Sequence, residues 1–194
     1  MNLPNKLTIL RIVLVPVMVA TLLLDFEFHF IASGVLFAAA AITDFFDGLI
    51  ARKNNLVTNF GKFADPIADK ILVISALVCF QWHGLCDPIV VIIVLFREFV
   101  VTSVRLSAAA NGKVVAANIW GKLKTVSQMG AIVLVFILQM ALEIIKAVGS
   151  AQSAIALSST FYYIGEIALW ISTVFVIMSG IKYVIDNKDA ISDM

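Results

Sequence analysis

Four aspartates lie close together in an otherwise apolar chain. They form two pairs, Asp44 with Asp47 and Asp65 with Asp69, whose members are three and four positions apart. On helices, both spacings place the two side chains on one face. An aspartate in apolar surroundings costs free energy unless something compensates its charge. The two pairs therefore need a common partner.

Divalent metal ions are the expected partner of these carboxylates. If the two helix ends face each other, the four carboxylates repel one another unless cations lie between them. Oxygen ligands select hard ions such as Mg²⁺ or Mn²⁺. A pair of such ions, bridged by carboxylates, can neutralise an attacked phosphate and stabilise a leaving phosphate. The spacing thus favours metal-dependent phosphoryl chemistry, with a pair of ions in each subunit.

The residues that follow the first aspartate pair suit a phosphorylated ligand. Gly48 and Ala51 have little or no side chain, so a ligand can approach the helix backbone there. Arg52 carries a guanidinium that can bind a phosphate through two hydrogen bonds. Gly61 and Pro66 shape the connection and the start of the next helix.

Membrane-spanning helices must position these residues. The chain has 194 residues, of which 61% are hydrophobic and only 14% charged, whereas about a quarter of a soluble domain is charged. A transmembrane helix needs about 20 mostly apolar residues. Segments that qualify lie at about Leu7–Leu24, Ile31–Ile50, Asp65–Trp82, Pro88–Leu106, Leu123–Val148 and Phe161–Ile185. We expect an all-α integral membrane protein, a single domain over residues 1–194 that forms a six-transmembrane-helix bundle.

The basic residues predict how this bundle lies in the membrane. With six spans, most lysines and arginines fall on one side, together with both termini and the aspartates. An excess of Lys and Arg marks the cytoplasmic side. We expect a multi-pass protein of a bacterial plasma membrane, with its first helix retained and its active site facing the cytoplasm. The net charge of +1 gives no basic field that would favour nucleic acid.

The aspartates and their neighbours also match a family pattern. Asp44-x2-Asp47-Gly48-x2-Ala51-Arg52-x8-Gly61-x3-Asp65-x3-Asp69 resembles, at every defined position, the signature of the CDP-alcohol phosphotransferases. Those are integral membrane enzymes with six transmembrane helices, typically homodimers. They use a divalent metal to displace CMP from a CDP-linked donor with an alcohol. The resemblance implies the same fold, assembly, cofactor and reaction here.

The resemblance implies a role for each matching residue. Asp44, Asp47 and Asp65 would bind the metal. Asp69 would contact the metal site too, and would act as the general base on the acceptor hydroxyl. The residues expected to contact the CDP part of the donor are Gly48, Ala51, Arg52, Thr58 and Gly61.

Other segments resemble the branch of this family that makes phosphatidylglycerophosphate. They are NLPNKLTILRIVLVP at the start, FREFVVTSVRL at 96–106 and GKLKTV at 121–126. Within the first segment, Asn5 and Thr8 match positions that contact the donor, CDP-diacylglycerol. The alternative for these two residues is a cap at the start of the first helix.

The acceptor of that branch, glycerol 3-phosphate, carries a phosphate that requires fixed cations. Arg105, Lys122 and Lys124 lie near the cytoplasmic ends of the fourth and fifth segments. They either bind this phosphate or anchor the helices at lipid headgroups. Arg97 and Glu98 lie deep in the fourth segment, where we expect a buried ion pair in which Arg97 also braces the site.

Three other functions are compatible with parts of this pattern. The same chemistry could use another acceptor, namely inositol phosphate, serine or phosphatidylglycerol. A cation transporter could use the aspartates as its ion site, but this function does not explain Gly48, Ala51 and Arg52. A structural scaffold would leave four costly carboxylates without a task.

Overall fold

The computed structural model describes residues 3–24, 26–53, 59–110, 119–149 and 151–187. Side chains are described in these ranges except at residues 3–4, 45–53, 59–64, 109–110 and 151. In this part of the chain every regular element is an α-helix. The helices are α1 (Leu3–Leu23), α2 (His29–Lys53), α3 (Asn59–Trp82), α4 (Pro88–Ala110), α5 (Ile119–Val148) and α6 (Ala151–Asp186).

Most helices begin earlier than the apolar segments predicted, and α3 and α6 differ most. α3 begins at Asn59 and includes Pro66, which therefore lies inside the helix and not in its first turn. α6 begins at Ala151, ahead of the predicted Phe161. Its first residues, AQSAIALSST, are mostly small or polar and so lower the hydropathy, although alanine and glutamine favour a helix. Hydropathy marks the apolar part of a helix, and the helix can extend beyond that part.

Within the residues that the structure describes, three stretches of helix are long and apolar enough to cross a membrane, namely Asn5–Leu23, Ile119–Val148 and Gln152–Asp186. The charged residues of the predicted site lie mostly in the other helices, with aspartates in α2 and α3 and the Arg97–Glu98 pair in α4. In α2 the described apolar stretch, His29–Asp44, is shorter than a span requires. In α3 and α4 the charges lower the hydropathy. The all-α fold is therefore confirmed for the described residues, while the six spans stay a prediction.

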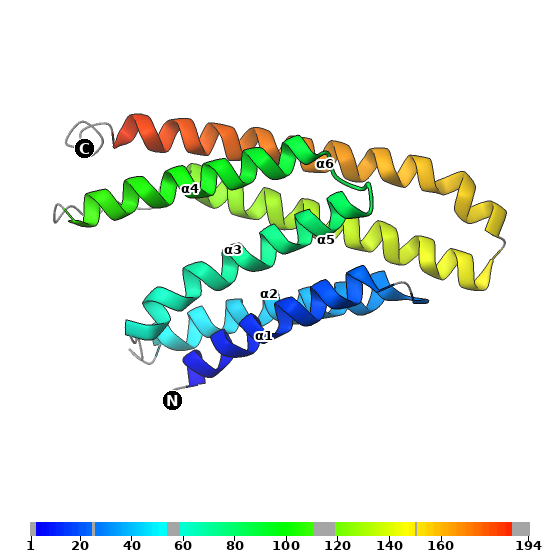
Figure 1. Ribbon diagram of the computed structural model, residues 1–194, viewed down its shortest axis with the longest axis horizontal. Coiled ribbons are helices and arrows are strands. Elements are labelled where there is room, and N and C mark those ends of the chain that lie inside the picture. Colours follow the sequence, from blue (N-terminus) through cyan, green and yellow to red (C-terminus); the bar gives the residue numbers. More distant parts are fainter. Residues whose placement is uncertain (1–2, 25, 54–58, 111–118, 150, 188–194) are drawn as a thin grey trace.

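The helices form two groups that meet along the bundle (Figure 1). α1 packs against α2 and α3, and α6 packs against α4 and α5. Contacts of α2 with α5 and of α3 with α4 join the groups. α1 begins and α6 ends at the same end of the bundle, where α2 and α4 also end and α3 and α5 begin (Figure 1). We call this the site end, and the opposite end the turn end.

Aromatic packing in the core connects the two groups. The ring of Phe136 in α5 lies 5.2 Å from that of Phe37 in α2 and 4.9 Å from that of Phe80 in α3, measured between ring centroids. All three side chains are buried. Gly34 lets α2 approach α5 closely, since a Cβ there would lie 2.9 Å from the Sδ atom of Met140. The core thereby fixes α2 and α3, which carry the aspartates.

Candidate active site

Helix α1 brings three of the four predicted aspartates together. The side chain of Arg11 is completely buried, and its Nη2 lies 2.7 Å from Asp44 Oδ1 in α2. Its Nη1 donates to Asp69 Oδ1 in α3 at 2.9 Å. Thr8, on the same face of α1 one turn earlier, donates from Oγ1 to Asp65 Oδ1 at 2.7 Å. Carboxylates from two helices thus converge on two neighbouring residues of a third.

Arg11 is a site residue that the sequence analysis missed. From the sequence, Arg11 is interpreted only as one of the basic residues that mark the cytoplasmic side of the membrane. Its spacing from Thr8, three positions, would have placed both side chains on one helix face. That signal becomes useful only once the partner of Thr8 is known to be Asp65, which lies 57 positions away in the chain.

The positions of Asn5 and Thr8 in α1 test the alternative that these residues cap the start of the first helix. α1 begins at Leu3, so both residues lie within the helix. The hydroxyl of Thr8 is buried and donates to a carboxylate of α3, well inside the helix and away from its first turn. The interpretation of Thr8 as a helix cap is therefore wrong. Asn5 lies one turn before Thr8 and is half-buried, and its contact with the donor stays a prediction.

Several predicted site residues lie outside the described side chains. Asp47, Gly48, Ala51 and Arg52 belong to the last turns of α2, and Gly61 belongs to the first turn of α3. Thr58 lies outside the described residues altogether. The roles predicted for these six residues stay predictions.

The aspartates fit a hard divalent cation by their chemistry. All four supply oxygen ligands, which Mg²⁺ and Mn²⁺ prefer. The side chains of Asp44 and Asp69 are 43% and 52% exposed, so a cation can reach them. The guanidinium of Arg11 already places a positive charge between these two carboxylates. Among the described residues, which leave out the side chain of Asp47, no three acidic, histidine or cysteine side chains lie close enough to hold a metal.

A second charged network begins at the next residue of α3. Lys70 follows Asp69 but points to α4, where its Nζ donates to Thr102 Oγ1 and lies 3.8 Å from Glu98 Oε2. Glu98 Oε1 accepts hydrogen bonds from Arg97 Nη1 at 2.9 Å and from Lys124 Nζ of α5 at 2.7 Å. One largely buried carboxylate therefore contacts three cations.

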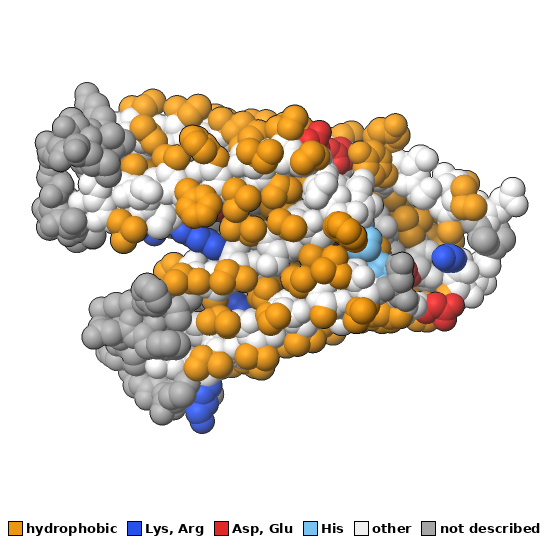
Figure 2. Space-filling model, viewed as in Figure 1, with side chains coloured by type: hydrophobic (Ala, Val, Ile, Leu, Met, Phe, Trp, Pro, Cys, Tyr) orange, Lys and Arg blue, Asp and Glu red, His pale blue; other side chains and the backbone are white. Residues whose placement is uncertain are grey.

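This network refines the predictions for the basic residues. The Arg97–Glu98 ion pair is confirmed. Lys124 is largely buried and turned to Glu98, whereas Lys122 is exposed, as expected for residues two positions apart on a helix. Arg105 is exposed as well. Figure 2 shows a hollow that opens at the site end between the two helix groups, with lysine or arginine side chains at its wall.

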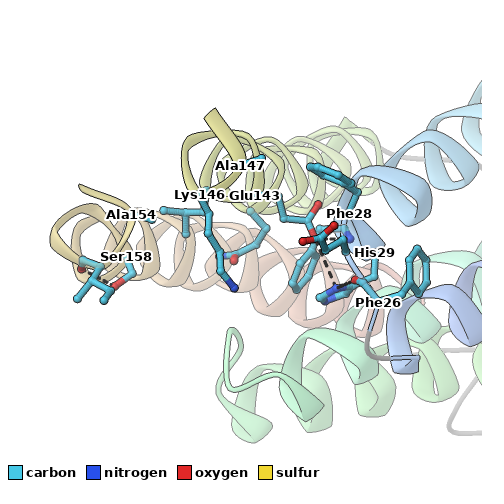
Figure 3. Close-up of a pocket in the computed structure, with 13 residues that line it drawn as sticks. Phe26, Phe28, His29, Glu143, Lys146, Ala147, Ala154 and Ser158 are labelled. Atoms are coloured by element: carbon cyan, nitrogen blue, oxygen red, sulfur yellow. Dashed lines mark hydrogen bonds and ion pairs between the residues drawn. The ribbon is translucent and has the colours of Figure 1, made fainter. Parts of the chain in front are cut away.

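Another cavity, of about 720 Å³, lies at the turn end (Figure 3). Glu143 of α5 points into this region and accepts hydrogen bonds from the backbone amides of Phe30 at 2.9 Å and Ile31 at 3.0 Å. Its carboxylate thus caps the start of α2. His29 Nδ1 lies 3.4 Å from the same carboxylate. Because these polar groups satisfy a helix end, and the aspartates lie at the other end of the bundle, we assign this cavity no part in the chemistry.

The comparisons with known proteins identify the family of this chain. Residues 1–178 match the family model of the CDP-alcohol phosphatidyltransferases. The chain belongs to this family, and the resemblance seen in the sequence is confirmed.

Among its relatives are enzymes with assigned reactions. The CDP-diacylglycerol–glycerol-3-phosphate 3-phosphatidyltransferase of Bacillus subtilis is 37% identical over an alignment 202 positions long, gaps included, which covers 98% of this chain and 97% of that protein. The enzyme of the same name from Rickettsia bellii is 39% identical over 182 residues, covering 94% and 93%. A probable phosphatidylglycerophosphate synthase of Mycobacterium tuberculosis is 46% identical over 134 residues, covering 68% and 64%.

Proposed function

We propose that this protein transfers the phosphatidyl group of CDP-diacylglycerol to sn-glycerol 3-phosphate, releasing CMP and forming phosphatidylglycerophosphate. The observation that carries the proposal is the similarity, over almost the full length of the chain, to relatives named CDP-diacylglycerol–glycerol-3-phosphate 3-phosphatidyltransferase. The convergence of Asp44, Asp65 and Asp69 at one end of the bundle supports it, since the family signature supplies these three carboxylates.

In this reaction a hydroxyl oxygen of glycerol 3-phosphate attacks the phosphorus that bears the diacylglycerol. A new P–O bond forms as the P–O bond to CMP breaks, and CMP leaves with the bonding electrons. Asp69 takes the proton of the attacking hydroxyl. About half of its side chain is exposed, so an acceptor can reach it, while Arg11 holds one of its oxygens in place.

The aspartates would also hold a divalent cation, Mg²⁺ or Mn²⁺, through Asp44, Asp47, Asp65 and Asp69. When bound, such an ion would offset the negative charge of the donor diphosphate. Arg11 and Thr8 would orient three of these carboxylates from behind, as hydrogen-bonding neighbours orient metal ligands in general.

The donor would occupy the space next to the aspartates. Asn5 of α1 would contact CDP-diacylglycerol directly, whereas the completely buried Thr8 would meet the donor only if its hydroxyl turned away from Asp65. Gly48, Ala51, Arg52, Thr58 and Gly61 would surround the CDP part. The acyl chains would remain in lipid. For the acceptor, we propose that Lys124, with Arg105 and Lys122 nearer the surface, binds the phosphate of glycerol 3-phosphate. The exposure of Arg105 and Lys122 and the burial of Lys124 support this division.

We further propose that the protein spans a bacterial plasma membrane six times and forms a homodimer. The site end would lie at the cytoplasmic face. The arrangement of the helix ends supports this orientation. The predicted site and both chain ends share one end of the bundle (Figure 1), and the sequence puts its excess of basic residues there.

An acceptor panel tests the proposed function. Purified protein receives labelled CDP-diacylglycerol with glycerol 3-phosphate, inositol phosphate, serine or phosphatidylglycerol, each with and without a chelator, and CMP release is measured. We expect CMP release with glycerol 3-phosphate but with none of the other acceptors. We expect no CMP release when the chelator is present. Release with only another acceptor would change the substrate. Metal flux into proteoliposomes without any CMP release would favour a transporter.

A further inference from the structure

Glu98 is the common partner of cations from three helices. Its side chain is 11% exposed and contacts Lys70 of α3, Arg97 of α4 and Lys124 of α5. Among the described side chains, a single carboxylate neutralises one of these charges, so the cluster keeps an excess of two positive charges. An uncompensated charge in a largely apolar bundle is costly. The cluster is therefore built to receive an anion.

The cations of this cluster are held in fixed positions. The Nη2 of Arg97 donates to the buried Ser179 Oγ of α6 at 2.7 Å. Gly180 makes room for the same arginine, since a Cβ there would lie 3.0 Å from Arg97 Cγ. Lys70 is also bonded to Thr102, whose own hydroxyl donates to the carbonyl of Glu98 at 2.7 Å. The network thus joins four helices before any ligand binds.

The cluster adjoins the aspartates through α3. Asp69 and Lys70 are consecutive, with Asp69 turned to Arg11 of α1 and Lys70 turned to Glu98 of α4. Lys70 is 34% exposed, so an anion can reach its ammonium group from outside. An acceptor whose phosphate lies at Lys70 would therefore lie beside the turn of α3 that also carries Asp69.

We propose that Glu98 is a positioning residue of the acceptor site: it preassembles Lys70, Arg97 and Lys124 into a cluster whose charge matches a phosphomonoester dianion. This inference rests on the proposed function and deepens it, adding Lys70 and Arg97 to the acceptor site and giving Glu98 a role other than a structural ion pair. Glu98 touches no reacting atom; it acts through the cations it orients.

The test separates positioning from stability by comparing the two substrates. Glu98→Gln keeps the size of the side chain but removes the charge that orients Arg97 and Lys124. We expect KM for glycerol 3-phosphate to rise about tenfold, the equivalent of one charge-assisted hydrogen bond, with KM for CDP-diacylglycerol unchanged. Glu98→Asp should recover part of the loss. Glu166→Gln, the same change near the turn end in α6, is the matched control and should leave both constants unchanged.

A second variant covers the case in which Glu98→Gln does not fold. Lys70→Gln alters the most exposed cation of the cluster and should produce the same selective rise in KM. Unchanged KM for glycerol 3-phosphate in either folded variant would overturn the inference, as would an equal rise in both KM values.

Binding of inorganic phosphate distinguishes a failure of this inference from a failure of the proposed function. The wild-type protein should bind radiolabelled phosphate in equilibrium dialysis, and both variants should bind it about tenfold more weakly. If the wild type binds phosphate in this way but releases no CMP with glycerol 3-phosphate, the proposed function fails and the anion site stands. If the wild type binds no phosphate, the anion site is refuted whatever the enzyme's activity.

Discussion

The guanidinium of Arg11 donates a hydrogen bond to Asp69 across 58 positions of the chain, at 2.9 Å, from a completely buried position. The same guanidinium lies 2.7 Å from Asp44. One side chain of α1 thereby fixes the distance between a carboxylate of α2 and a carboxylate of α3. The geometry of the site depends on the first helix as much as on the two helices that carry the family signature.

Replacing Arg11 should damage both stability and activity. Arg11→Lys keeps the charge but cannot reach two carboxylates with a planar fork, so we expect at least a tenfold loss of CMP release. Arg11→Met also removes the charge and should lower the melting temperature by about 2–4 °C for each kcal/mol lost. Lys6→Met, an exposed lysine of the same helix, is the control. Wild-type activity in Arg11→Lys would refute a bridging role.

The hydroxyl of Thr8 should be required, and its methyl group should not. Thr8→Val has nearly the same shape but leaves Asp65 without the hydrogen bond at 2.7 Å. A hydrogen bond to a charged group contributes about 1.5–3 kcal/mol, so we expect roughly a tenfold to hundredfold lower kcat/KM for CDP-diacylglycerol. Thr8→Ser keeps the hydroxyl and should remain within about threefold of the wild type. Equal losses in the two variants would show that packing, not the hydroxyl, matters.

The aspartates should differ in what their removal abolishes. Asp44→Asn should weaken Mn²⁺ binding, followed by electron paramagnetic resonance without any substrate, and reduce turnover more than about a hundredfold. Asp69→Asn should abolish turnover while substrate binding persists, because the amide cannot accept the proton. Turnover near the wild-type level in Asp69→Asn would contradict its assignment as the base.

Glu143 should matter for stability alone. Its carboxylate caps α2 through the amides of Phe30 and Ile31, a contribution of about 0.5–2 kcal/mol in helices generally. Glu143→Ala should therefore lower the melting temperature and leave both KM values unchanged. Glu27→Ala, an exposed carboxylate beside the same cavity, is the control. A selective rise in one KM in Glu143→Ala would instead connect the turn-end cavity with substrate binding.

The sequence was sufficient for the family and for the convergence of three aspartates, Asp44, Asp65 and Asp69. Fixed spacing carries this information, because residues three or four apart share a helix face wherever the helix lies. The ends of the helices were harder to predict from the sequence. The apolar segment predicted from hydropathy begins at Phe161, although α6 begins at Ala151 and runs through residues that are mostly small or polar but compatible with a helix.

The contacts between helices could not be predicted in the same way. Arg11 with Asp69 and Lys124 with Glu98 join residues far apart in the chain. Periodicity says which face a side chain occupies, and it says nothing about which helix lies opposite. The basic residues therefore looked alike as markers of a membrane side, although Lys124 is largely buried in a network and Lys122 is exposed.

Helix α3 holds Asp69 against one helix group and Lys70 against the other. Each residue advances a helix by about 100°, so losing or gaining one residue early in α3 would swing both side chains away from their partners in a single change. Contacts on two sides thus fix the rotation of α3 about its axis. Insertions and deletions among related chains should therefore be absent from its first half and confined to the connections between helices.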